Sequence, residues 1–437
     1  MLETIKIKKG LDIPLEGQPA RHVVDARRIR RYAVKPTDVV GFTPRLLVAE
    51  GDSVRAGQPL VADKNDERLF LPAPVDGTVE AIVRGEKRRL LEVVISSSTN
   101  PANPTIPTNL TSESPCWWML RERPFGIIAN PDHKPKGIFV SLRDTNPLAP
   151  DLAFALRGRE HEFEAGVKAL EAFAPVHCVR AEGPHPAGNI GSIVAAISPI
   201  NKGEYVWAVN AQDVATIGRW MLTGEYRPER VISVGGPAAK APQHYRVLCG
   251  ASVQRICDVQ LMEASYPILN STSNATISTR IISGSPLSGS RVDANGFLGM
   301  YDQQVTFIEE GDHYDFMGWL MPGLKKFSFS KTFLSGFARL LPIKNYPLPT
   351  EFNTNTHGSV RPFLFTGQFE RVFPFDIYPM QLIKACIVGD VELQEKLGIY
   401  EVEPEDFALC EFIDPSKTEI QTIIREALEV LRKEAMA

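Results

Sequence analysis

The strongest constraint on the fold of this 437-residue chain is an alternation of strand-like and helix-like patterns near its middle. This order predicts a parallel sheet covered by helices, as in Rossmann-like domains. A further apolar run, 230–234, leads directly into Gly235-Gly236-Pro237 and is expected to join the same sheet. The expected strands are 137–140, 176–179 and 206–209, and the expected helices are 159–173 and 211–222.

The first hundred residues show a different pattern, with short strands separated by Gly, Asp and Pro turns. Two half-motifs, 48–54 and 73–79, repeat the same order of residue types, which resembles the barrel-sandwich hybrid of lipoyl and biotinyl carrier domains. Such carriers present a modified lysine on a tight hairpin, and Lys64 is the only candidate here. Because the segment 64–74 is long and charged for that hairpin, we expect the barrel to serve as structure without lipoylation or biotinylation.

The remaining segments complete the prediction of an α/β multidomain chain. Residues 98–115 are rich in Ser, Thr, Asn and Pro, as linkers are. The motif 280–289 resembles the β-grasp module called SLBB, and the C-terminal segment has a helical pattern that opens on a capping box from Ser416 to Glu419. The predicted units are a barrel-sandwich hybrid at 1–100, a linker at 101–125, a Rossmann-like α/β domain at 126–244, a β-grasp SLBB-like domain at 245–345 and a C-terminal helical domain at 346–437.

Composition and charge exclude several classes of protein. A net charge of −4 at pH 7 argues against a dedicated nucleic-acid binder. No apolar run approaches the roughly 20 residues that span a bilayer, and the charged start MLETIKIKKG is no signal peptide. The six cysteines form no CxxC pair and no disulfide framework. We therefore expect a cytoplasmic chain with reduced thiols, whose role at a membrane could only be peripheral.

The stretch GPHPAGNIG, residues 183–191, is called the signature loop below. It superficially resembles a loop that cradles a phosphate. A dinucleotide fingerprint requires GxGxxG, but Pro186 stands where the first glycine belongs and removes an N–H that a phosphate would bind. No Gly-Lys-Ser/Thr follows, which excludes a P-loop. A structural or subunit-facing turn is the favoured interpretation, and a nucleotide site is the alternative.

The segment 314–349 is aromatic, basic and interrupted by prolines. If it is exposed, such a segment marks a partner or membrane interface. If it is buried, it belongs to the core, and the sequence leaves both interpretations open.

Six motifs along the chain together resemble a known family, the NqrA family of bacterial Na⁺-translocating NADH:quinone reductases. The resemblance extends from Lys6 to about Lys433. It implies a protein without transmembrane helices, bound at the cytoplasmic face of the inner membrane to five other subunits. That complex oxidises NADH, reduces ubiquinone and pumps sodium outward, and NqrA is associated with its quinone end. The motifs are, in order, IKIKKGLDIPLEGQP, IFVSLRDTNPLAPD, GPHPAGNIGS, SVGGPA, FMGWLMPGLKKFS and EDFALCEFIDPSK.

The family is distantly similar to the NADH- and FMN-binding subunit of respiratory complex I and to the RnfC protein of the Rnf complex. Their glycine-rich flavin loop has no counterpart at 118–125, where the first glycine is Gly126. Of their cysteine cluster only Cys410 remains, with Cys386 distant, and one cysteine cannot hold a cluster that needs four ligands. The resemblance thus implies that this chain holds no metal and no tightly bound cofactor. NADH, flavins, iron–sulfur centres and Na⁺ are expected on other subunits.

Two functional hypotheses, and a weaker third, follow from the resemblance. The chain either contributes to quinone binding and reduction, from ubisemiquinone to ubiquinol, or acts as an assembly scaffold of the same complex. In the third hypothesis, the chain retains a residual flavin or NADH site. No catalytic residue is assigned, and the isolated chain is not expected to be active alone. The weak candidates for a quinone contact lie in the signature loop, where the His185 ring could donate to a quinone carbonyl or bond to nearby backbone; they are Gly183, His185, Gly188 and Gly191.

Overall fold

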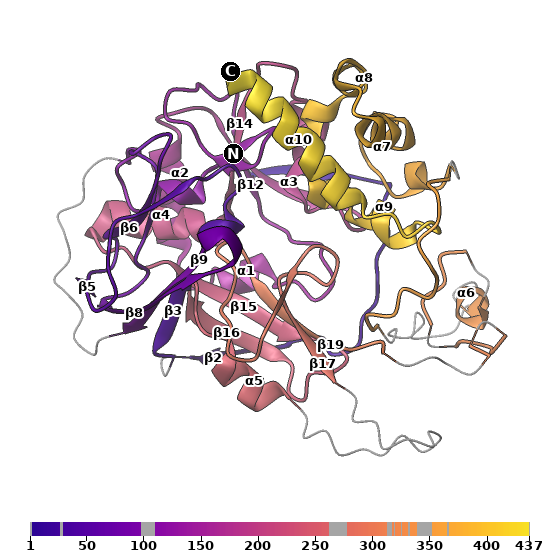
Figure 1. The fold of residues 1–437 in the computed structure, drawn as a ribbon, viewed down its shortest axis with the longest axis horizontal. Coiled ribbons are helices and arrows are strands. Elements are labelled where there is room, and N and C mark those ends of the chain that lie inside the picture. The colour runs from indigo at the N-terminus through magenta and orange to yellow at the C-terminus, as the bar shows by residue number, and fades with distance from the viewer. Residues whose placement is uncertain are drawn as a thin grey trace.

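A computed structural model gives the fold (Figure 1). The predicted interface or core segment, 314–349, is described only in part. Five of its described large apolar side chains are exposed, among them Leu320 at 63%, whereas Phe327 packs against Phe412 of the C-terminal helices. The described residues are 2–26, 29–97, 110–261, 278–312, 317–318, 320–324, 326–330, 333–338, 352–364 and 367–436.

The first sheet confirms the predicted α/β domain. It has six strands in the order β1-β13-β12-β14-β10-β11; the first four are parallel, and β10 runs antiparallel to β14. Helices α2 (Glu160–Leu170), α3 (Ile190–Ile197) and α4 (Ala211–Thr223) connect or follow the central strands. The strand bounds are β1 Leu2–Lys6, β13 Val176–Glu182, β12 Ile138–Ser141, β14 Val206–Asn210, β10 Arg121–Arg123 and β11 Ile127–Ile128.

Helices cover both faces of this sheet, and the alternation along β12 shows how. Val140 belongs to the same apolar cluster as Val214 and Ile217 of α4, whereas Phe139 packs with Ile193 of α3. Successive side chains of a strand point to opposite faces. Residues 138–140 of the strand are therefore all apolar, because each face of the strand meets a helix.

The second sheet corrects the prediction for residues 230–234. They form β15 (Glu229–Gly235), which pairs with β16 (Gln243–Leu248) and β19 (Gln304–Glu309) and not with the first sheet. All seven residues of β15 are buried, and such a run predicts a buried strand without indicating its sheet. The predicted boundary at 244/245 consequently falls inside β16. The order is β18-β17-β19-β15-β16-β2, with β18 Ser290–Val292, β17 Thr279–Ser283 and β2 Ala20–Asp25.

Three short segments also lie outside the units predicted for them. Strands β1 and β2 precede the barrel in sequence but join the first and second sheets. Within the predicted linker at 101–125, Trp117 and Trp118 are buried and β10 pairs with β14. Long-range pairing decides these placements, so local composition could not reveal them. The SLBB-like character of 245–345, which supplies β17–β19 and helix α5 (Gln254–Gln260), stays a prediction.

The barrel-sandwich unit consists of two small sheets with orders β3-β9-β8-β5 and β4-β6-β7. The repeated half-motifs meet in the first of them, because β5 pairs antiparallel with β8 through Ser53–Thr78 and Val54–Gly77. Lys64 lies in the connection from β6 to β7. The bounds are β3 Arg31–Val34, β9 Leu90–Ser97, β8 Gly77–Arg84, β5 Ser53–Val54, β4 Pro44–Leu46, β6 Pro59–Asp63 and β7 Phe70–Pro72.

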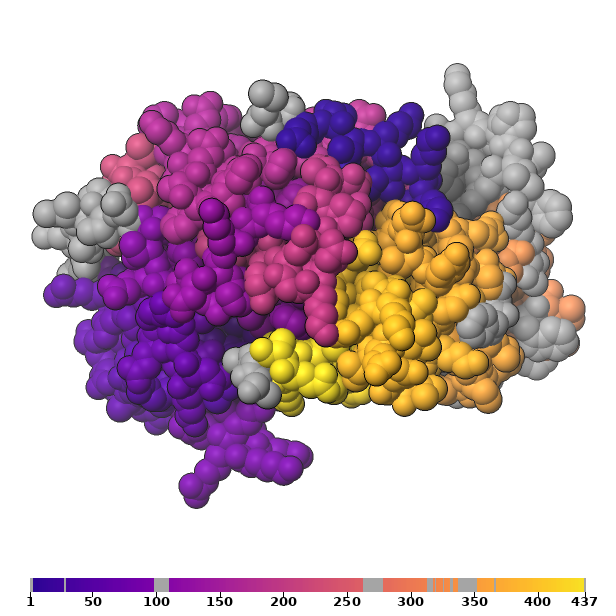
Figure 2. All heavy atoms as spheres, turned by 90° about the horizontal axis from the view of Figure 1, so that it is seen from above, coloured from indigo at the N-terminus to yellow at the C-terminus, as the bar shows by residue number. Residues whose placement is uncertain are grey.

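The C-terminal residues form helices α7 (Pro379–Val388), α8 (Val391–Lys396), α9 (Ala408–Ile413) and α10 (Ile420–Met436) around an apolar core of their own. They lie beside the α/β domain (Figure 2). The predicted capping box is wrong. The side chain that receives the backbone N–H groups of Ser416 and Thr418 is Asp414, whereas the Ser416 hydroxyl is buried without a partner.

A buried arginine joins the C-terminal helices to the first sheet. Arg123 of β10 is 1% exposed; its Nη2 donates to Asp406 Oδ2 at 2.7 Å, and its Nε lies 3.6 Å from Glu403 Oε1. Helix α10 supports the same contact through Arg425, whose Nη1 donates to the carbonyl oxygen of Phe125 at 3.3 Å.

We expect Arg123→Met to lower the free energy of unfolding by about 3–5 kcal/mol, because it leaves two buried carboxylates without their cation. Arg68→Met is the matched control, since Arg68 is 42% exposed and pairs with Asp66 and Asp132 at the surface. Such surface pairs are worth less than about 1 kcal/mol. Urea denaturation measures both variants, and equal losses would contradict a special role for the Arg123 contact.

Candidate functional site

The glycines of the signature loop are required by close packing with three distant segments. Gly183 has φ +137°, and a Cβ there would overlap the carbonyl oxygen of Ile7. A Cβ on Gly188 would overlap the carbonyl oxygen of Arg143, and one on Gly191 would overlap the Asp406 carboxylate. Backbone oxygens exclude a Cβ at Gly183 and Gly188, and the Asp406 side chain disfavours one at Gly191. A phosphate is therefore not needed to explain the pattern.

His185 is buried in the same junction, with 1% of its surface exposed. Its backbone N–H donates to Asp12 Oδ1 at 2.9 Å, and its carbonyl oxygen accepts from the Leu11 N–H at 2.7 Å. The ring Nδ1 lies 3.3 Å from Thr145 Oγ1, while the buried Nε2 has no hydrogen-bond partner among the described residues. Burial lowers the pKa of His185 to about 4, so the ring is neutral near pH 7. These contacts attach the N-terminal segment to the α/β domain.

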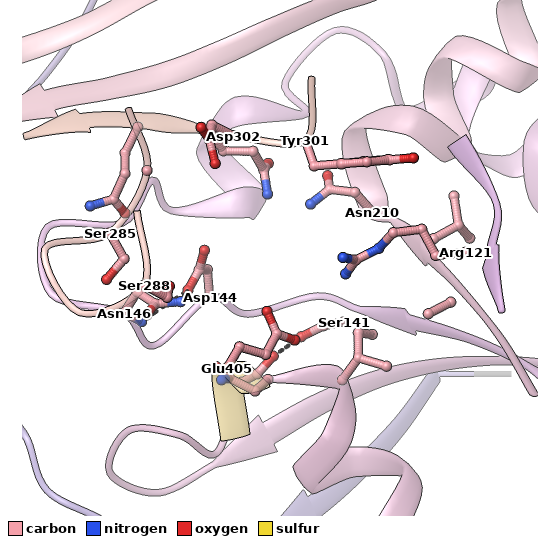
Figure 3. A pocket seen from close by; sticks show the side chains of 18 of the residues that line it. Arg121, Ser141, Asp144, Asn146, Asn210, Ser285, Ser288, Tyr301, Asp302 and Glu405 are labelled. Carbon is pink, nitrogen blue, oxygen red and sulfur yellow. Dashed lines mark hydrogen bonds between the residues drawn. The ribbon is translucent and has the colours of Figure 1, made fainter. Parts of the chain in front are cut away.

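A cavity of about 350 Å³ lies next to this junction, at the carboxyl ends of β12 and β14. In open α/β sheets, ligands bind in the crevice outside these strand ends. Among the four signature-loop candidates, only Gly188 lines the cavity; Gly183, His185 and Gly191 do not. Figure 3 shows polar side chains from several elements meeting in it: Arg121, Ser141, Asp144, Asn146, Asn210, Ser285, Ser288, Tyr301, Asp302 and Glu405.

The charges in the cavity are unevenly paired. The guanidinium of Arg121 has no ion pair within 4 Å in the described part of the chain, and it lies 5.2 Å from the ring centre of Tyr301. Burial raises the pKa of Glu405 to about 7 and also raises the pKa of Asp144 and Asp302. Arg425 lines the same cavity; burial lowers its pKa, and the charge of nearby Arg121 acts in the same direction. The cavity therefore holds two guanidinium groups close together and acids held partly out of water.

Sequence reasoning missed these residues because they lie far apart in the chain. The one local signal was the stretch 118–125, which lacks the expected glycines and contains Arg121. The chemistry also differs from what a quinone ring needs. A quinone slot is mainly apolar with one or two donors, whereas charged and amide side chains dominate here.

Other features bear on cofactors and membranes. Within the described ranges, no group of three or more His, Cys, Asp or Glu side chains is placed to hold a metal ion. None of the helices described is both long and apolar enough to span a membrane.

Comparison with known proteins places this arrangement in a class. The NqrA N-terminal barrel-sandwich hybrid domain matches residues 5–98, and the NqrA second alpha/beta domain matches 104–180 and 171–226. The fold and these matches define the class of protein: a chain in which a barrel-sandwich hybrid domain is followed by an NqrA-type α/β domain. Relatives named as the NqrA subunit of Na(+)-translocating NADH-quinone reductase align with 98% of this chain. Rhodopirellula baltica has one at 35% identity over 98% of its own length, Haemophilus influenzae one at 35% over 100% and Neisseria meningitidis one at 36% over 100%.

The chain belongs to the NqrA family of Na(+)-translocating NADH-quinone reductase subunits, which confirms the resemblance carried by the six motifs. Among solved structures, an NAD+-reducing NiFe hydrogenase aligns with 69% of this chain and 55% of its own at 9% identity. Its TM-score of 0.31 is too low to support an argument about fold or function.

A neutral buried His185 makes stability depend on pH. The pKa of His185 is about 4 in the folded chain, below the ordinary value of 6.5. Between pH 6.5 and 4 the unfolded chain therefore binds a proton at His185 that the folded chain does not bind. The contribution of His185 to stability is therefore lost as the pH falls from 6.5 toward 4, by up to about 3 kcal/mol. Glu405, whose pKa is raised, acts in the opposite direction over the same range, so the measurement is the difference between variant and unaltered chain in urea titrations from pH 4.5 to 8. We expect the curve of His185→Gln to lose this contribution, whereas His161→Gln, at an exposed site, should follow the unaltered chain; parallel curves for His185→Gln and the unaltered chain would contradict the burial argument.

Two opposing effects determine how Gly191→Ala changes the free energy of unfolding. Alanine is favoured over glycine inside a helix by about 1 kcal/mol, but its Cβ would overlap the Asp406 carboxylate that Arg123 holds from the other side. Overpacking of this kind costs roughly 1–3 kcal/mol. We expect a net loss of stability on urea denaturation. The control is Gly358→Ala, whose Cβ would meet only the Lys417 side chain at 3.7 Å. A net gain for Gly191→Ala would show that Asp406 can move away.

Proposed function

We propose that this chain is a peripheral subunit of an Na⁺-translocating NADH:ubiquinone oxidoreductase at the cytoplasmic face of the bacterial inner membrane. In this proposal it contributes to quinone binding and to reduction of ubisemiquinone to ubiquinol, which the complex couples to outward sodium transport. Electrons reach the quinone from cofactors on the five other subunits, and this chain binds none of them tightly. The observation that carries the proposal is the near full-length match to relatives named as the NqrA subunit of that reductase.

The polar cavity is a poor place for the quinone ring, so we propose that its slot is completed by partner subunits. Exposed large apolar side chains offer the surface for such a contact, since apolar patches on a folded chain mark interfaces. They gather in the described part of 314–349 and around the turn between α7 and α8. Among them are Leu320, Met321, Leu324, Leu334, Ile387 and Val388.

A scaffold without a quinone contact is the second candidate, and the signature loop favours it. Its glycines are accounted for by contacts with Ile7, Arg143 and Asp406, and His185 is enclosed among them. A loop used in this way joins three parts of the chain and needs no ligand. In that case the chain would organise the membrane subunits, and the quinone would bind on them alone.

The two candidates differ in what the purified full chain does with a short-chain ubiquinone. We expect decylubiquinone to quench the tryptophan fluorescence with saturation near one equivalent, unchanged by NADH or FMN. Decanol, which has the alkyl chain without the ring, controls for nonspecific apolar binding. Isothermal calorimetry on the same samples guards against optical artefacts.

Absence of saturation, or equal effects of decylubiquinone and decanol, would reject quinone binding by the chain alone and favour the scaffold. Saturation that His185→Gln abolishes without loss of folding would instead place the quinone at the signature loop.

A further inference from the structure

The cavity at the carboxyl ends of β12 and β14 has no part in the proposed function, yet it is built like a binding site. We propose that it reversibly binds a phosphate monoester that carries neighbouring hydroxyl groups, the chemistry shared by nucleoside monophosphates and sugar phosphates. This ligand is distinct from the quinone. The proposal rests on the charges, the polar lining and the size of the cavity.

Two arginines supply the anion-binding end. Arg121 extends from β10, and Arg425 reaches the same space from α10. Arg121 is free of ion pairs within 4 Å in the described ranges, and Tyr301 lies over its guanidinium. The charges of Glu403 and Glu405 act on both guanidinium groups and offset part of their mutual repulsion. A phosphate between the two arginines would accept charge-assisted hydrogen bonds from both.

The start of helix α3 reinforces this end. Gly188, Asn189 and Ile190 line the cavity where the helix begins. The N-cap residue Asn189 makes no side-chain hydrogen bond to the first turn, whereas Asn210 caps α4 by accepting from the Gln212 N–H. The helix N-terminus adds partial positive charge beside the two arginines.

The opposite part of the lining suits hydroxyl groups. Asp144 accepts from the backbone and side chain of Asn146 through Oδ1 alone, each at 2.9 Å, which leaves Oδ2 for a ligand. The hydroxyls of Ser285 and Ser288 and the carboxylate of Asp302 lie in the same part (Figure 3). A carboxylate that accepts from ribose hydroxyls is the usual arrangement at this edge of a doubly wound sheet.

Size selects the class of ligand. Ligand pockets range from about 300 to 1,000 Å³, so the roughly 350 Å³ found here is at the lower limit. It admits a mononucleotide or a sugar phosphate rather than a dinucleotide. The polar lining also excludes the alkyl tail of a quinone.

The first test compares ligands on the unaltered full chain by isothermal calorimetry at constant ionic strength. The probes are AMP, ribose 5-phosphate, adenosine and inorganic phosphate. We expect saturable 1:1 binding of AMP or ribose 5-phosphate, at least tenfold tighter than adenosine and than phosphate. Equal affinity for AMP and ribose 5-phosphate identifies a sugar-phosphate site, and tighter binding of AMP identifies a nucleotide site.

No binding of either ester at millimolar concentration would overturn the proposal. Binding of inorganic phosphate as tightly as the esters would also overturn it, since that is the behaviour of an adventitious ion only.

Variants then assign the two ends of the site. Arg121→Gln should weaken ester binding at least tenfold, and Asp144→Asn should abolish the preference for AMP over its 2′,3′-dideoxy analogue. Arg255→Gln, on exposed helix α5 outside the cavity, should change neither. Circular dichroism checks that each variant folds, and the ligand comparison on the unaltered chain decides the proposal if one does not. Unchanged ester binding by folded Arg121→Gln would overturn the assignment of the phosphate to this cavity.

Discussion

The arrangement of the domains depends on one buried carboxylate, that of Asp406. It accepts from Arg123 Nη2 at 2.7 Å and from the Glu403 N–H at 2.9 Å, and it lies against Gly191 at the start of α3. Strand β10 of the first sheet, a helix on a face of that sheet and the C-terminal helices thus meet at a single side chain. Burial raises the pKa of Asp406, and the charge of Arg123 opposes that shift. The charged pair tolerates burial because its partners approach closely, and glycine at 191 leaves room for the Asp406 carboxylate.

The cavity follows from the same arrangement. The first sheet, the second sheet and the C-terminal helices meet around the carboxyl ends of β12 and β14 without filling the space between them. The acidic side chains of the cavity are shielded from water without gaining a full set of hydrogen-bond partners. Burial therefore raises the pKa of Glu405, Asp144 and Asp302. Polar groups held in this way lower stability unless a partner satisfies them.

Local patterns predicted the parts of the fold that depend on local periodicity. Strands β12, β13 and β14 and helices α2 and α4 lie where the alternation placed them, and the two half-motifs of the barrel pair through β5 and β8. The predictions that failed concern features that depend on contacts between residues far apart in the chain. The β15 run is equally apolar in either sheet. The first turn of α10 is bonded by Glu411, a distant side chain whose Oε2 accepts from the Gln421 N–H at 2.8 Å, and not by Ser416. The cavity unites Arg121 with Glu405 and Arg425, a juxtaposition that no spacing in the sequence encodes.

The signature loop shows how a phosphate-like pattern arises without a phosphate. Glycine is needed wherever another segment approaches the backbone closely, and a bound ligand is only one such segment. Here Ile7, Arg143 and Asp406 occupy the positions that a ligand would take in a true phosphate loop, and Pro186 removes an N–H from it. The free polar groups lie instead beside the loop, where Gly188 forms part of the cavity wall. The loop builds the site by fixing its wall, and the side chains that recognise a ligand come from other parts of the chain.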